Sequence, residues 1–259
     1  MVSLKNQDDL AKLRVSGRIL AETLAAVARE ARIGNSLKSL DALAKDLIEK
    51  AGAKPAFLGY RAAGDKNPYP ASTCLSLNDQ VVHGLPNDIL LKEGDVLKID
   101  IGVDYGGYIT DSALTVGVGE ISPLAKKLIG ATRAILDICL AECLPDRHVG
   151  DIGAAIEEAV KAENFSVVEN LTGHATGFAL HEDPAVYNYG RRGEGMELAP
   201  GMVLAIEPMV AAGRGAIRQQ PDGSFSTKDG SLAAHFEQTV AITENGQEIL
   251  TPFLIDNFY

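Results

Sequence analysis

Glu207 stands inside an almost wholly apolar run, and this one placement limits what the chain can fold into. The run, VLAIEPMV, covers residues 203–210 and is typical of a buried strand. An ionised carboxylate in such a strand costs free energy unless it is paired with a cation or bound to a metal. The fold must therefore place either a buried positive side chain or a metal site beside Glu207.

Two more acids are expected to approach each other on a predicted hairpin. In the strand VLKIDIGV the alternate residues are apolar and face a core, so Asp100 lies on the opposite face. If Asp104 and Gly107 close the following turn, Asp111 of the next strand lies directly opposite Asp100. Like charges in that position oppose folding, so the pair indicates either a solvated sheet face or a bound cation.

Histidine is scarce, with five in the chain, and three of the five are expected in loops marked by glycine or proline. These three are His83, His174 and His181. The glycine before His174 lets the backbone bring a side chain close to a ligand. A lone histidine is more often structural or exposed, and the settings of His148 and His235 indicate no function.

Taken alone, Glu237 gives the weakest indication of a functional site among these acids, because polar residues lie among its neighbours. Together, Asp100, Asp111, Glu207 and Glu237 carry the charge that balances two divalent cations, and without metal they would repel one another. Carboxylate oxygen combined with imidazole suits manganese, iron, cobalt or zinc better than calcium. Two such ions close together activate water near neutral pH, so this residue set favours hydrolysis.

Helices and strands are predicted in an order that occurs twice. Apolar spacing and capping residues predict helices at residues 8–32, 36–51, 123–143 and 151–163. Strand-like runs are predicted at residues 73–77, 96–103, 108–118, 166–169, 202–210, 216–219 and 236–243. This order predicts a pseudo-two-fold α+β fold, in which helices pack on one face of a mainly antiparallel sheet. No linker is visible, so we expect residues 1–259 to form one domain.

Composition argues against several classes of function. The chain has 24 basic and 35 acidic residues, and a net charge of −11 argues against nucleic acid or an anionic membrane as the main partner. No run of about 18 apolar residues is present, and the N-terminal residues lack a signal-peptide core. Three cysteines are too few for a disulfide framework. We therefore expect a cytoplasmic protein.

Six short motifs resemble those of the pita-bread metallopeptidases, in particular the type I methionine aminopeptidases, and they occur in the family's order. The motifs are SLNDQVVHGLP at residues 76–86, KIDIG at 98–102, TDS at 110–112, TGH at 172–174, HEDP at 181–184 and EPM at 207–209. The resemblance covers nearly the whole chain. It implies the pita-bread fold, whose duplicated α+β arrangement agrees with the order of elements described above.

The resemblance also implies which side chains bind metal. Asp100 would chelate one of two divalent ions (Co, Mn, Fe or Zn), and Asp111 and Glu237 would bridge both. His174 and Glu207 would hold the second ion. Glu207 would also take the proton from the attacking water.

For the substrate, the resemblance implies that His181 stabilises the oxyanion at the scissile carbonyl. His83 would contact the substrate near the scissile amide. Tyr60, Tyr69 and Cys74 are the expected pocket residues. The implied reaction removes the N-terminal methionine from nascent polypeptides when the second residue is small, with the substrate amine bound to a metal.

Peptide or nascent-chain N-termini are therefore the expected partners, with transient ribosome contact, no specific nucleic acid, no membrane, and a monomeric protein. The chain departs from the family's usual pattern around the expected side-chain pocket and not at the metal ligands. The departures are Ala175, Thr176, Leu180, Ser224, Gln238 and an apparent insertion at residues 61–68.

Two other interpretations of the sequence remain open. One is a proline-specific aminopeptidase of the same fold, although such enzymes carry a large N-terminal domain for which there is little room before Asp100. The other is a non-catalytic binding module of this fold, although such relatives lose metal ligands and this chain has all five.

Overall fold

The computed structural model describes residues 2–61, 67–255 and 258. Its four helices are α1 (Gln7–Glu30), α2 (Leu37–Lys50), α3 (Pro123–Leu140) and α4 (Val149–Ala162). All four predicted helices are confirmed, with ends displaced by at most a few residues. Capping explains where they begin, because the side chains of Asn6, Ser36 and Ser122 accept hydrogen bonds from the first backbone amides of α1, α2 and α3.

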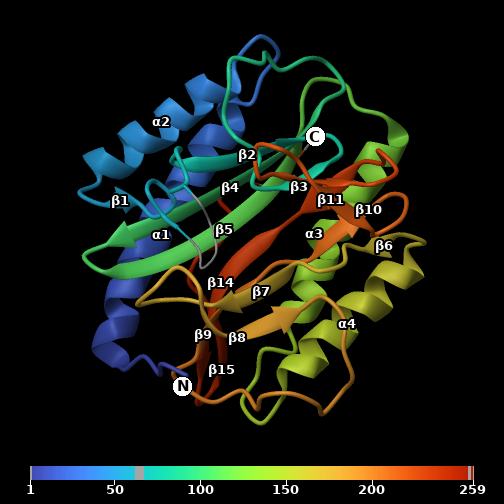
Figure 1. Cartoon of the computed structure of the whole chain (residues 1–259). Coiled ribbons are helices and arrows are strands. Elements are labelled where there is room, and N and C mark those ends of the chain that lie inside the picture. The colour runs from blue at the N-terminus through green and yellow to red at the C-terminus, as the bar shows by residue number, and fades with distance from the viewer. Residues whose placement is uncertain (1, 62–66, 256–257, 259) are drawn as a thin grey trace.

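A nine-stranded antiparallel sheet joins the two halves of the chain. Its main path runs β1-β4-β5-β14-β9-β7-β8, and β2 and β15 pair with β4 and β14. The strands are β1 (Lys54–Pro55), β2 (Thr73–Leu77), β4 (Val96–Tyr105), β5 (Tyr108–Gly117), β7 (Thr172–Ala175), β8 (Glu182–Tyr187), β9 (Val203–Ile206), β14 (Glu237–Thr243) and β15 (Gly246–Ile249). Strands from both halves therefore meet at the centre of one sheet (Figure 1).

Two small sheets flank this large one. The first has the order β13-β10-β6 and the second β11-β12-β3. Their strands are β3 (Gln80–Val82), β6 (Ser166–Val167), β10 (Met209–Ala211), β11 (Ile217–Gln219), β12 (Phe225–Thr227) and β13 (Ala233–His235). Two helices followed by several strands occur twice along the chain, as predicted.

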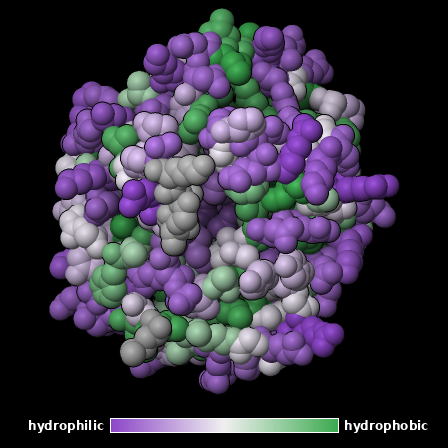
Figure 2. Space-filling model, in the orientation of Figure 1, coloured by the Kyte–Doolittle hydropathy of each residue, from purple (hydrophilic) through white to green (hydrophobic). Residues whose placement is uncertain are grey.

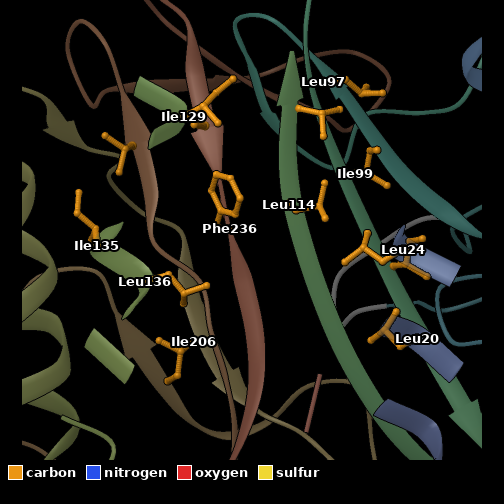
Figure 3. Close-up of a cluster of buried hydrophobic side chains, with 14 of the residues drawn as sticks. Leu20, Leu24, Leu97, Ile99, Leu114, Ile129, Ile135, Leu136, Ile206 and Phe236 are labelled. Carbon is orange, nitrogen blue, oxygen red and sulfur yellow. The ribbon is translucent and has the colours of Figure 1, made fainter. Parts of the chain in front are cut away.

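The apolar core lies between the large sheet and the helices. Figure 3 shows Leu20 and Leu24 of α1 beside Leu114 of β5, and residues of α3 beside Phe236 and Ile206 in the other half. The helices thus cover one face of the sheet. The opposite face, which carries Asp100, is not covered by helices. Within the described part of the chain, no helix combines the length and apolarity needed to cross a membrane.

The strand predicted at 202–210 is divided at Glu207. β9 ends at Ile206 in the large sheet, and β10 begins at Met209 in a small one. Pro208 has no backbone N–H for a sheet hydrogen bond, so the ladder is interrupted there. The same change of sheet occurs at Phe236, between β13 and β14. Glu207 and Glu237 therefore lie where the chain passes between sheets, and not in mid-strand.

The predicted hairpin register is wrong by two residues. Tyr105 pairs with Tyr108, and Gly106 and Gly107 form the turn with φ of 62° and 88°. Positive φ at both central residues is typical of a two-residue hairpin turn. Asp111 consequently pairs with Gly102, and Asp100 pairs with Ala113. A shift of two keeps both acids on one face, so they are diagonal neighbours instead of direct partners.

Replacing Phe236 by alanine is expected to lower the free energy of unfolding by about 3–5 kcal/mol. The ring is fully buried and lies 5.9 Å and 5.2 Å, centroid to centroid, from Phe253 and Phe258, so its loss leaves a cavity. Urea unfolding of the metal-free protein measures the change. Ile138→Ala on the exposed face of α3 is the control, with an expected change within about 0.5 kcal/mol. Equal effects of the two substitutions would contradict this account of the core.

Candidate metal centre

The side chains singled out from the sequence all line one cavity of about 460 Å³. They are Tyr60, Tyr69, Cys74, His83, Asp100, Asp111, His174, His181, Glu207 and Glu237. The cavity lies on the face of the large sheet that the helices leave uncovered. Figure 2 shows this side of the molecule, which is hollowed near its centre.

Adjacent strands bring the acids together. Asp100 lies on β4 and Asp111 on β5, and Glu237 begins β14, where it pairs with Ala113 of β5. His174 lies on β7 opposite Ala205 of β9, and Glu207 follows directly after β9. The segment around His174 was expected to be a loop. It is a strand instead, and its pairing to β9 holds the imidazole beside the acids.

The distances between these side chains suit a metal. Ligand atoms of Asp111, His174 and Glu237 all lie within 4.8 Å of one another. His174 Nε2 is 3.9 Å from Asp111 Oδ2 and 3.7 Å from Glu207 Oε1. One carboxylate oxygen each of Asp100, Asp111 and Glu237 is buried without a hydrogen-bond partner among the described residues. Buried, unpartnered carboxylate oxygens are the groups that a divalent ion would satisfy.

Burial and mutual repulsion raise the pKa of all four acids well above the usual range. Burial is the larger cause, and the charge of a neighbouring acid adds to it in each case. The buried Lys98 does not provide the cation that Glu207 requires, because its Nζ donates to the carbonyl oxygen of Asn78 at 2.7 Å. Among the described residues, neither lysine nor arginine forms an ion pair with these four carboxylates.

His174 is prepared to act as a neutral ligand. Its Nδ1 donates to the carbonyl oxygen of Ala175 at 3.0 Å, which leaves the Nε2 lone pair directed toward the acids. Burial, aided by the nearby His181, lowers the pKa of His174 to about 3. The imidazole is therefore uncharged at neutral pH, as metal binding requires.

A second imidazole, that of His181, lines the cavity beside His174. The ring of His181 stands 4.4 Å from that of His174, centroid to centroid, at 87°. His181 Nδ1 is hydrogen bonded to the Tyr60 hydroxyl at 2.6 Å, and burial lowers the pKa of the imidazole. His83 has a φ of 59° and packs on Phe225 with ring centroids 5.7 Å apart. These contacts hold both histidines in the cavity wall.

One wall of the cavity is apolar. Phe57, Cys74 and Leu180 form a buried cluster against which Tyr60 and Tyr69 pack. Burial raises the pKa of the Cys74 thiol well above its usual range, so this wall carries no charge. An apolar pocket thus adjoins a charged, oxygen-rich site.

The model of the metallopeptidase family M24 matches residues 11–244, which is most of the chain. The chain belongs to metallopeptidase family M24. It is 44% identical over 252 residues to the methionine aminopeptidase of Clostridium perfringens, a match that covers 97% of this chain and 99% of that protein. The predicted family, and with it a metal-dependent hydrolase, is confirmed.

Solved structures of family M24 have the same fold. The methionine aminopeptidase of Thermotoga maritima superposes with a TM-score of 0.93 at 38% identity, over 97% of this chain and 99% of that one. The prolidase of Pyrococcus furiosus superposes with a TM-score of 0.76 at 20% identity, over 97% of this chain but 66% of that one. The pita-bread fold is thus confirmed, and M24 membership implies use of divalent metal.

The departures from the M24 pattern mostly lie outside the cavity. Of the five altered residues, only Leu180 lines it, as part of the apolar wall. Gln238 instead donates to the Thr251 carbonyl oxygen at 2.9 Å, and Ser224 bonds Asp222 at 2.7 Å. The apparent insertion at residues 61–68 falls largely outside the described residues.

The sequence interpretation missed His235. Its Nε2 lies 3.4 Å from Glu207 Oε2, and burial lowers the pKa of the ring to about 3. His235 precedes Glu237 by two residues, a spacing that in a continuous strand places both side chains on one face. That spacing was the available signal. His148, by contrast, caps the start of α4, where its backbone amide donates a hydrogen bond to the Asp151 carboxylate.

Metal uptake at pH 7 is expected to release protons. Burial and mutual repulsion raise the pKa values of these carboxyls in the metal-free protein, so the cluster holds protons to higher pH than free carboxyls do, whereas metal ligation requires the ionised form. His174 contributes no proton, because it is already neutral. Calorimetric titration with Mn²⁺ in buffers of different ionisation enthalpy measures the release.

The number of protons released is expected to fall as the pH rises, since the carboxyls then ionise before metal binds. Glu237→Gln removes one titrating carboxyl and should reduce the number. A binding heat that does not depend on the buffer would contradict the raised pKa values.

Proposed function

We propose that this protein removes the N-terminal methionine from polypeptides whose second residue is small. The observation that carries the proposal is the convergence of four carboxylates and a neutral imidazole beside an apolar pocket. Identity of 44% over nearly the full length of a methionine aminopeptidase supports the same conclusion.

Two divalent ions, among Co, Mn, Fe and Zn, are the proposed cofactors. Four carboxylates would balance their charge, and Asp100, Asp111 and Glu237 would supply oxygen ligands to the ions. His174 and Glu207 complete the set. When bound, such ions supply Lewis acidity to water and to the substrate carbonyl.

The protein's own groups would carry the proton and the developing charge. Glu207 accepts the proton of the attacking water, and its buried, water-poor setting makes the carboxylate a stronger base than an exposed one. With Tyr60 donating to Nδ1, His181 keeps its proton on Nε2 and can donate it to the oxyanion. His83, held against Phe225, would contact the substrate near the scissile amide.

The apolar wall would hold the methionine side chain. Phe57, Cys74 and Leu180 form its buried part, and the partly buried Tyr60 and Tyr69 pack against them. Tyr69 is fixed, because its hydroxyl shares its one proton between the backbone oxygens of Thr73 and Gly84, at 3.0 Å and 3.1 Å. A rigid, uncharged pocket suits a flexible thioether chain.

The alternatives have less support. A proline-specific peptidase shares the fold, but the prolidase matched here is a longer chain at 20% identity. A non-catalytic module would have no need for buried, mutually repelling acids. Action on nascent chains with transient ribosome contact, as a cytoplasmic monomer, belongs to the same proposal.

Restoring metal to chelator-stripped protein is expected to restore cleavage of Met-Ala-Ser, and not of Ala-Pro-Ser. Each ion (Co, Mn, Fe and Zn) is added separately, and the released amino acid is measured. Metal content of the active samples should approach two ions per chain. Preferential cleavage before proline would overturn the proposed substrate, and inactivity with every ion would overturn the proposed reaction.

Replacing His181 by alanine is expected to lower kcat by about 10²-fold or more, because a donor to the oxyanion is lost. Steady-state kinetics with Met-Ala-Ser measures the change, and bound metal should stay constant. Tyr60→Phe removes only the hydroxyl bonded to Nδ1 and should have a smaller effect. An unchanged kcat in the alanine variant would exclude this role for His181.

A further inference from the structure

His235 is a buried imidazole that faces the site without lining its cavity. The residue is 1% exposed, and neither ring nitrogen has a hydrogen-bond partner among the described residues. Its Nε2 lies 3.4 Å from Oε2 of Glu207. A buried polar group without a partner is costly, so this one contact needs an explanation.

The backbone around His235 is held from two sides. In the small sheet, His235 pairs with Met209, two residues after Glu207. The Thr115 hydroxyl donates to the carbonyl oxygen of His235 at 2.7 Å and accepts from its amide at 2.9 Å. The ring is thereby fixed against the bend that carries Glu207.

The two oxygens of Glu207 face different partners. Oε1 lies 3.7 Å from Nε2 of His174, toward the metal ligands, whereas Oε2 faces His235. The backbone of Glu207 is held separately, because Asn188 Nδ2 donates to its carbonyl oxygen at 3.0 Å. His235 is thus the group in position to set the rotation of the carboxylate.

We propose that His235 is a positioning residue, which donates from Nε2 to Oε2 of Glu207 and so keeps Oε1 directed toward Nε2 of His174, among the residues that would hold metal. The inference deepens the proposed function and rests on it. Donors that orient a metal-binding carboxylate typically contribute about 10–100-fold to metal affinity or activity.

Three substitutions separate hydrogen bonding from packing. His235→Gln places an amide donor at about the position of Nε2. His235→Asn places its amide donor only as far out as Nδ1. His235→Leu keeps a side chain of similar volume but has no donor. Thr132→Val is the matched control, because it also removes a buried polar group, whose bond to the Leu128 carbonyl oxygen lies within α3.

The leucine and asparagine variants are expected to weaken Mn²⁺ binding, measured calorimetrically on stripped protein, by about 10-fold or more. They should lower kcat on Met-Ala-Ser by a similar factor and leave KM within about twofold, since His235 does not line the cavity. The glutamine variant should retain both properties within about threefold, and Thr132→Val should match the unaltered protein.

Unchanged metal affinity and kcat in the leucine variant would overturn the proposal. Equal losses in the glutamine and leucine variants would also overturn it, because they would indicate packing and not a donor. If the proposed substrate is wrong, Met-Ala-Ser is not cleaved, yet Mn²⁺ affinity still distinguishes glutamine from leucine.

A measurement on the unaltered protein tests the same proposal even if the variants fail to fold. Nitrogen-15 NMR of the Zn²⁺-loaded protein reports which ring nitrogen of His235 carries the proton. Protonation at Nε2 is expected, and protonation at Nδ1 alone would overturn the assignment.

Discussion

Repulsion among four buried carboxylates is the constraint on which the rest of this structure depends. Asp100, Asp111 and Glu237 lie on adjoining strands and Glu207 directly follows another, and their raised pKa values express the unfavourable burial of so much negative charge. The sheet can hold them together because its other face buries a large apolar core against the helices. The candidate metal centre thus lies where burial of charge opposes folding of the metal-free protein.

Two of these acids are positioned where the chain passes from one sheet to another. Glu207 and Glu237 each lie where the chain leaves one sheet for another, so neither is confined to the pleat of a regular strand. Pro208 interrupts the first strand, and Phe236 anchors the second in the core. At the same bend Asn188 and His235 contact Glu207 from behind the cavity.

The cavity combines two environments that suit a peptide with a free amine and an apolar first side chain. Carboxylate oxygens and His174 line part of the cavity, and an apolar wall formed by Phe57, Cys74 and Leu180 adjoins them. The ring of His181 lies close to that of His174, and its Nδ1 is hydrogen bonded to the Tyr60 hydroxyl. Departures from the family pattern, such as Gln238, are absorbed by hydrogen bonds away from this cavity.

The sequence by itself determined the helices, most strands, the face on which Asp100 and Asp111 lie, and the family. Apolar periodicity and short motifs are local properties, and they suffice for those conclusions. Only the tertiary structure decided the two-residue register shift, the division of the strand at Glu207 and the contact between His235 and Glu207. Periodicity specifies the face of a residue, whereas its partner depends on turn geometry and on strands that pair across long distances in the chain.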